Sequence, residues 1–338
     1  MEETKETKPE FVKSELAKYD EGFVPEYRNR KMTVEIVDAG KTPDVSENDS
    51  VTGGEKVVAQ TQEAQPATPI EKKEKKNISY GPGKINVGLT GKTLKEVLAV
   101  IKAADTEAVF KFRKDGISVL VIDPGHVMMA SMEIPKNSLI EYWYDTEADK
   151  VRVGLDAERL MKLMPYNKDD AIDLHIDTYN NAARGKLTVD NGSIKAAVDT
   201  LDVESIKDLR EPLISTDDYA VLPAKKFRDV LRTAALITDH VKIEFDRETV
   251  TVRTESDDGS AETVFSRDEM KELKVTNPGK AVYPLDYLIN IMKTVKADEI
   301  KISLKQDYPI KIESYLMPSR GGEKNIYVKY LLAPRMEE

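Results

Sequence analysis

The feature of this sequence that most constrains the fold is an internal repeat. Residues 92–119 align with residues 225–252 without a gap, and residues 155–176 align with residues 283–304. The matched apolar positions pair Leu94 with Phe227, Val97 with Val230, Phe110 with Ile243, Leu160 with Leu288 and Ile172 with Ile300. This unit is much longer than the repeat of a solenoid, so the sequence predicts two copies of one domain joined by a connector.

Both copies have the same order of predicted elements. Apolar residues at helical spacing predict helices over residues 93–102, 156–164, 224–235 and 285–295. Alternating or continuous apolar runs predict strands between them, in the first copy over residues 85–89, 109–112, 117–122, 128–134, 139–144, 150–153, 172–176, 183–189 and 193–197. The turns at residues 114–116 and 191–192 predict hairpins. Each half is therefore expected to be an α+β domain of antiparallel sheet with two short helices, without parallel βαβ units.

The composition divides the chain into four segments. Residues 1–84 are rich in Glu, Lys, Thr and Pro and are predicted to be a mostly disordered N-terminal extension, with at most a brief strand at residues 33–37. Residues 85–198 form the first predicted domain and residues 218–338 the second. The acidic stretch over residues 199–217, which lacks a helical or strand period, is the connector.

The chain has a net charge of −10, yet basic residues gather on particular faces of the predicted helices. Basic residues recur on the helix faces opposite the apolar stripes, at Lys92, Lys95, Lys102, Arg159, Lys162, Lys225, Arg228, Arg232 and Lys293. Any surface helix keeps its lysines outward, which is the simpler explanation for one helix. Because the basic face recurs in both copies, the pattern favours salt-sensitive binding to nucleic-acid phosphates without base readout.

The sequence offers no constellation of an enzyme. His126, His175 and His240 lie in three different contexts without the spacing of metal ligands, and no nucleophile or nucleotide-binding motif is present. We therefore expect no cofactor, no metal and no catalysis. The absence of cysteine favours an intracellular, cytoplasmic protein, and no apolar run or N-terminal signal predicts contact with a membrane.

Several separate motifs resemble one known family. They are GKTLKEVL at 91–98, DGISVLVIDPGHVMMASMEIP at 115–135, LDVESIKDL at 201–209, TDHVKIEF at 238–245, YPLDYL at 283–288, DYPIKIE at 307–313 and YLLAPRMEE at 330–338. In this order they resemble the archaeal sliding clamps of the proliferating cell nuclear antigen family over roughly residues 84–338. The first eighty or so residues have no counterpart in that family.

The resemblance implies a homotrimeric ring that encircles double-stranded DNA. The helices would line the hole, the antiparallel sheets would form the outside, and the basic helix residues named above would face the phosphates. Such a clamp is a processivity factor in replication and repair, and its partners are DNA polymerase, the clamp loader, flap endonuclease and DNA ligase. The family often has basic residues at the positions of Glu96, Asp229 and Asp286, so a less positive inner face is expected here.

The resemblance also implies a pocket for short partner motifs. The matching positions are Ile122, His126, Val127, Met129, Ile206, Leu209, Pro309, Ala333 and Pro334. In the sequence itself, Ile206 and Leu209 are apolar residues in a charged connector, which favours a docking surface. The alternative is that they fix the connector to its own domain, and both roles are compatible. Two other functions remain open: a non-encircling adaptor or regulatory subunit of a heteromeric ring, and an enzyme that acts on nucleic acid and would need clustered carboxylates.

Overall fold

The computed structural model describes residues 84–163, 167–178, 184–206, 209–212, 214, 216–316 and 325–335. Residues 1–83 of the expected extension, with the brief strand at residues 33–37, lie outside the described residues, whereas its last residue, Lys84, begins the first strand. All described residues belong to one of the two units into which the chain divides. None of the helices in the described ranges is long and apolar enough to cross a membrane.

The elements of the first half precede the connector. They are β1 (Lys84–Thr90), α1 (Gly91–Lys102), β2 (Glu107–Arg113), β3 (Gly116–Ile122), β4 (Met128–Pro135), η2 (Lys136–Ser138), β5 (Glu141–Asp145), β6 (Val151–Asp156), α2 (Ala157–Lys162), β7 (Ala171–Thr178), β8 (Gly185–Asp190) and β9 (Lys195–Asp199).

The second half repeats this order. It contains β10 (Tyr219–Pro223), α3 (Ala224–Ala234), β11 (His240–Phe245), β12 (Thr249–Ser256), β13 (Gly259–Ser266), η3 (Arg267–Glu269), β14 (Glu272–Lys274), β15 (Gly279–Pro284), α4 (Leu285–Thr294), β16 (Glu299–Ser303), β17 (Ile310–Leu316) and β18 (Ile326–Leu332). Element by element, β1 corresponds to β10, α1 to α3 and β9 to β18, so the repeat predicted from the sequence is a repeat of structure.

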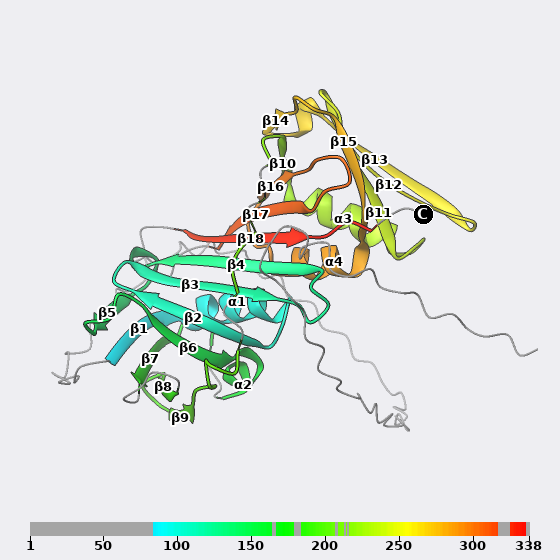
Figure 1. Ribbon diagram of the computed structural model, residues 1–338. Helices are drawn as coiled ribbons and strands as arrows, with labels where there is room; N and C mark the ends of the chain where they lie inside the picture. The colour runs from blue at the N-terminus through cyan, green and yellow to red at the C-terminus, as the bar shows by residue number, and fades with distance from the viewer. Residues whose placement is uncertain are drawn as a thin grey trace, which may run out of the picture. The chain divides into compact units, whose positions relative to one another are not determined.

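The strands form three antiparallel sheets. The first has the order β5-β1-β7-β8-β9, the second β14-β10-β16-β17-β18-β4-β3-β2-β6, and the third β13-β12-β11-β15. The nine-stranded sheet is shared, because β18 of the second half pairs antiparallel with β4 of the first, from Tyr327 opposite Glu133 to Leu332 opposite Met128. Figure 1 shows these two strands lying side by side where the halves meet.

The helices form where the sequence predicts them, with small shifts at their ends. Thr90 caps α1 by accepting a hydrogen bond from the Thr93 amide at 3.2 Å, and Asp156 caps α2 through the Arg159 amide at 2.8 Å. α1 contacts α2, α3 contacts α4, and α1 also contacts α4 across the two halves. Their apolar faces join one hydrophobic core that contains residues of both halves, so the four helices adjoin on one side of the sheets.

Candidate nucleic-acid interface and partner pocket

The basic residues of the four helices lie almost entirely at the surface. Of the nine predicted to face DNA, all except Arg228 are exposed, while the opposite faces of the same helices are buried in the core. The helical period places them there, because residues opposite a buried stripe must point to solvent. As α2 contacts α1, α1 contacts α4 and α4 contacts α3, these exposed faces belong to adjoining helices.

Some of these cations have acidic neighbours on their own helices. Lys162 Nζ lies 2.7 Å from Glu158, and Arg232 Nη1 lies 3.4 Å from Asp229. The Lys162 and Arg232 side chains are exposed, and ion pairs of exposed residues are weak and easily exchanged. A phosphate can therefore compete for both cations.

Arg228 has a different environment from the other eight. Its Nε donates to the Met292 carbonyl at 3.1 Å and its Nη2 donates to the Val295 carbonyl at 3.0 Å, so the guanidinium caps the C-terminal end of α4. The last carbonyls of a helix lack intrahelical donors, and a planar guanidinium can serve two of them at once. This cation ties α3 to α4 and is only half-exposed.

The three acidic positions expected to weaken the inner face are not equivalent. Glu96 is buried, although it lies on α1, whereas Asp229 and Asp286 are exposed. Burial raises the pKa of the Glu96 carboxyl in spite of nearby Lys92 and Lys296. Glu96 therefore presents little of its charge to solvent, and two acidic positions rather than three remain at the surface.

An apolar cluster separate from the main core lies on the outward face of the shared sheet. Met129, Leu331 and Ala333 are buried in it, and the partly buried side chains of Leu120, Ile122, Val127 and Ile214 pack against them. Alternation along β3 explains the placement, because Val119 and Val121 join the main core and the residues between and after them point the other way. The structure thus brings together four of the nine predicted pocket residues: Ile122, Val127, Met129 and Ala333.

Three members of this cluster, Leu120, Leu331 and Ile214, were not predicted as pocket residues. Leu120 and Leu331 lie two positions from the predicted residues Ile122 and Ala333, on the same strand faces. A period of two along each strand would have identified them. Ile214 has no such signal, because it lies in the connector, where no period holds.

The connector is fixed at both ends of its path across the sheet. Leu201 bridges to Gly154 on β6, and a Cβ at Gly154 would come within 3.1 Å of the Ile206 Cδ1 atom, so the glycine makes room for Ile206. Near its other end, Glu211 pairs with Lys329 of β18. Since β2, β3 and β4 separate β6 from β18, the connector crosses the face that carries the cluster. Ile206 contacts β6 at the start of this path and so fixes the connector to its own domain.

The remaining predicted pocket residues lie around this path. Leu209 is partly buried in the connector, Pro309 and Pro334 are buried next to β17 and β18, and His126 is partly buried in the loop between β3 and β4. The Ala333 amide donates to the Val127 carbonyl at 2.9 Å, which joins the end of the chain to that loop.

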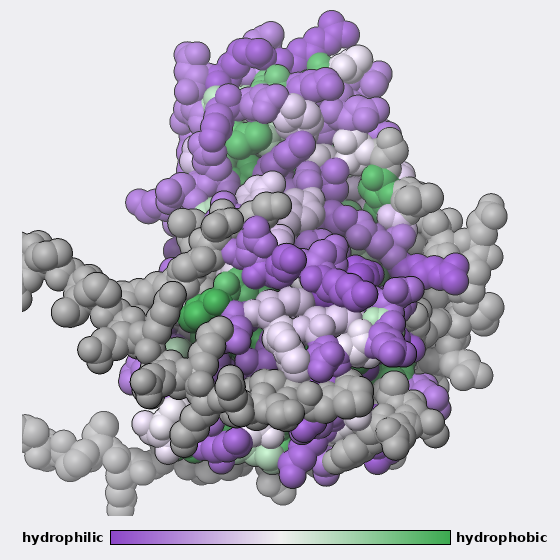
Figure 2. All heavy atoms as spheres, turned by 90° about the vertical axis from the view of Figure 1, so that its left-hand side faces the viewer, coloured by the Kyte–Doolittle hydropathy of each residue, from purple (hydrophilic) through white to green (hydrophobic). Residues whose placement is uncertain are grey.

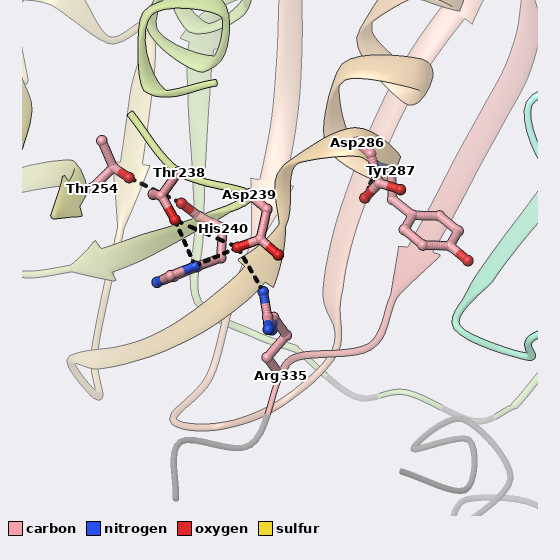
Figure 3. A network of polar contacts seen from close by, with 7 residues as sticks. All are labelled: Thr238, Asp239, His240, Thr254, Asp286, Tyr287 and Arg335. Carbon is pink, nitrogen blue, oxygen red and sulfur yellow. Dashed lines mark hydrogen bonds and ion pairs between the residues drawn. The ribbon is translucent and has the colours of Figure 1, made fainter. Parts of the chain in front are cut away.

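Arg335, which follows Ala333 and Pro334, is anchored to the second half of the chain. Arg335 donates its amide to the Val282 carbonyl at 2.7 Å, and its Nη1 lies 3.0 Å from Asp239 Oδ1, which also lies 2.8 Å from His240 Nδ1 (Figure 3). The hydrogen bond with His240, and next the one with Arg335, lower the pKa of Asp239. This network fixes the direction in which Ala333 and Pro334 leave β18.

The described part of the chain contains no group of three or more His, Cys, Asp or Glu side chains that could hold a metal ion. Figure 2 shows that the coloured residues on the side of the molecule at the left of Figure 1 are mainly hydrophilic, with hydrophobic ones in small separate groups. On the described surface of that side, polar contacts with solvent therefore predominate.

Two family models match the chain. The N-terminal domain of proliferating cell nuclear antigen matches residues 88–207, and its C-terminal domain matches residues 214–335. Both models leave residues 1–87 unmatched.

Curated archaeal relatives align with most of the chain. The DNA polymerase sliding clamp of Thermoplasma volcanium is 31% identical over 256 residues, which is 75% of this chain and all of that protein. The DNA polymerase sliding clamp of Picrophilus torridus is 34% identical over 252 residues, which is 74% of this chain and 98% of that protein.

Solved structures have the same fold. PCNA of A. fulgidus, solved with the C-terminal region of FEN-1 bound to it, superposes with a TM-score of 0.66 at 26% identity, covering 75% of this chain and 99% of that one. PCNA of Thermococcus kodakaraensis superposes with a TM-score of 0.61 at 20% identity, covering 74% of this chain and 100% of that one, and supports the fold alone. From its two domains, its relatives and its fold, this chain belongs to the proliferating cell nuclear antigen family.

Proposed function

We propose that three copies of this chain close into a ring around double-stranded DNA and hold replication and repair enzymes on it. As a member of this family, the chain is a DNA polymerase sliding clamp and processivity factor, an accessory protein in DNA replication. Beyond this role, we propose the ring itself, the residues that face DNA and the individual partners. In this proposal the chain has no catalytic activity of its own, and the enzymes that it tethers carry out the reactions.

The observation that carries the ring is the equivalence of two strand edges. Inside one chain, the two halves join through β18 and β4. Their counterparts in the repeat are β9 and β13, and within the described residues each of these has a paired strand on one side only. If β13 of one copy pairs with β9 of the next, every joint in the assembly repeats the joint that one chain already contains.

The side chains on these edges support the same pairing. Ile194, directly before β9, is 43% exposed, and Val264 on β13 is 44% exposed, which makes them two of the few large hydrophobic residues exposed at the described surface. Unpaired edges with exposed apolar side chains tend to pair with another chain. Three chains then contribute six similar domains, and closed symmetry leaves neither the β9 edge nor the β13 edge of any copy unpaired.

The basic helix faces support the placement of DNA inside the ring. The eight exposed basic residues lie on the four helices, while the whole chain carries a net charge of −10. Contacts of this kind are made to phosphates, depend on salt and read no sequence, which is what a sliding protein requires. The cytoplasm, where the chromosome of an archaeal cell lies, is the proposed location.

The apolar cluster under the connector supports short-motif binding by partners. Its described members are contributed by β3, the loop between β3 and β4, β4 itself, the connector and the end of β18. We assign DNA polymerase, flap endonuclease, DNA ligase and the clamp loader to this surface. The A. fulgidus relative, solved with the C-terminal region of FEN-1 bound, provides the comparison for one partner of this class.

The ring is tested by retention on DNA of different topology. After loading by its clamp loader, the clamp should remain on a closed circular duplex and leave when one cut makes the DNA linear. Equal loss from circular and linear DNA would contradict encirclement and favour the adaptor of the same fold. The inclusion of a second, different clamp subunit in the native complex would favour the heteromeric ring.

A further inference from the structure

We propose that the Tyr287 hydroxyl, on helix α4 of the second half, is a positioning group for the partner pocket. It would hold the loop of residues 123–127, which supplies His126 and Val127 to the pocket. The inference rests on the proposed function, because the pocket is assigned there. Tyr287 itself lies outside the apolar cluster and would act on the cluster through the carboxylate of Asp123.

Asp123 organises this loop and is only 5% exposed. Its Oδ1 accepts hydrogen bonds from the Val127 amide at 2.7 Å and the Met128 amide at 2.5 Å. Its Oδ2 accepts from the Gly125 amide at 3.0 Å and from the Tyr287 hydroxyl at 3.1 Å. A carboxylate with four donors has one preferred orientation, and the loop backbone follows that orientation.

The loop needs such support because part of its backbone is strained. His126 has a φ of 55°, in the left-handed region that residues other than glycine seldom occupy. Val127, the next residue, packs against both the main core and the apolar cluster, and its carbonyl accepts from the Ala333 amide. A small change at His126 would therefore move Val127 and the contact with the end of β18.

Tyr287 is the donor to Asp123 that comes from outside the loop. The three amide donors lie within five residues of Asp123, whereas Tyr287 is 164 residues away in sequence. Burial and the Asp123 carboxylate raise the pKa of the Tyr287 hydroxyl, so it stays protonated and donates at any physiological pH. In Figure 3 its ring projects from the start of α4, away from Asp239 and Arg335.

The loop sequence is adapted to this contact. A Cβ at Gly125 would lie 2.9 Å from Asp123 Oδ2 and 3.7 Å from the Tyr287 hydroxyl oxygen. Any side chain at residue 125 would disturb the Asp123 carboxylate, whose Oδ2 accepts from both the Gly125 amide and the Tyr287 hydroxyl. A simpler role for Tyr287, as a staple between the two halves, predicts a loss of stability without a specific loss of pocket affinity, and the experiment separates the two.

The test compares the full-length chain with its Tyr287→Phe variant, which loses the hydroxyl and keeps the ring. A synthetic peptide with the sequence of the FEN-1 C-terminal region is titrated into each by calorimetry. We expect the dissociation constant to rise about three- to tenfold, as for the loss of one net hydrogen bond, with the mass in solution unchanged. The matched control is Tyr219→Phe, since the Tyr219 hydroxyl also donates to a carboxylate, that of Glu272, but far from the loop in sequence.

Hydrogen exchange provides the second measurement. In Tyr287→Phe, the amides of Gly125, Val127 and Met128 should exchange faster, while those in the core of α4 keep their protection. Equal peptide affinity of wild type and Tyr287→Phe, or an equal loss in Tyr219→Phe, would overturn the positioning role. If the wild type itself fails to bind the peptide, the pocket assignment fails, and unchanged exchange in the loop would then overturn the role of Tyr287 as well.

Discussion

At the scale of single residues, the guanidinium of Arg228 contributes to the fold rather than to a charged surface. Its two hydrogen bonds reach the last carbonyls of α4 from α3, so it fixes two neighbouring helices relative to one another. The helical period puts Arg228 on the outward side of α3, and from the sequence it is indistinguishable from Lys225 and Arg232. Its acceptors lie 64 and 67 residues later in the chain, where a local pattern gives no information.

Replacement of Arg228 by lysine should therefore reduce stability more than DNA binding. One ammonium group cannot satisfy both carbonyls with the geometry of the guanidinium. We expect the free energy of unfolding to fall by about 1–3 kcal/mol, as when buried acceptors lose their donor. Denaturant titration measures this change. If stability stays the same and the affinity for DNA falls, Arg228 contacts phosphates through its guanidinium instead.

The buried carboxylate of Glu96 predicts a pH dependence of stability. Burial raises its folded pKa above the ordinary value of 4.5, so the folded chain binds this proton more tightly than the unfolded chain does. Ionisation therefore costs folding free energy as the pH rises through the folded pKa. Its Oε2 atom has no hydrogen-bond partner among the described residues, which agrees with that cost.

Glu96→Gln removes the titration and keeps the size of the side chain. The stability of the variant relative to wild type should rise as the pH goes from below 4.5 to neutral, because only the wild type then loses stability by ionisation. Unfolding curves across this range measure the difference. A difference that stays constant with pH would mean that Glu96 does not titrate with folding.

At the scale of elements, the sequence predicted the helices and most strands but not how the strands assemble. Helix ends were predicted within a few residues, since α1 and α4 have buried stripes at the period of 3.6. The pairing of β18 with β4 was not predicted, because register between distant strands depends on three-dimensional packing. The same limit explains the pocket: Ile122 and Ala333 were identified by resemblance, whereas the Ile214 contact required the path of the connector.

The basic helix faces make a prediction that belongs to the helices as a set. Reversal of charge at Lys95, Lys102 and Arg232 should weaken DNA binding and reduce the slope of log affinity against log salt by about 0.9 for each phosphate that the variant no longer neutralises. The matched control reverses three exposed lysines on strands and turns, Lys114, Lys274 and Lys280. Binding to a labelled duplex at several salt concentrations measures both slopes. Equal effects of the two sets would mean that net charge, not the helix faces, determines binding.

At the scale of the whole molecule, the repeat means that the joint within one chain is a template for the joint between chains. The internal joint is continuous, with six residue pairs in register from Tyr327 to Leu332. The edges that would repeat it, β9 and β13, are the end strands of two separate sheets within the described residues, so each can accept a strand of another copy. A head-to-tail contact of this kind forms a ring when the rotation closes and a filament when it does not. The mass in solution therefore distinguishes the two, because a closed ring has one defined mass and a filament does not.

Val264→Asp should prevent this assembly without unfolding the chain. Val264 is 44% exposed on the β13 edge, so a carboxylate there is solvated in the monomer and is desolvated only when a neighbour covers it. Light scattering should give three times the 38.0 kDa mass of one chain for the wild type. A chain that begins at Lys84 should give three times its own, smaller mass, and Val264→Asp should give the mass of a single chain. The control is Ile140→Asp, because Ile140 is equally exposed, at 44%, but precedes β5, whose repeat counterpart β14 takes no part in the internal joint. If Ile140→Asp is a monomer and Val264→Asp is not, the contact between chains does not use the β13 edge, and the proposed joint is wrong. A trimer only for the chain that begins at Lys84 would make residues 1–83 a regulator of ring closure.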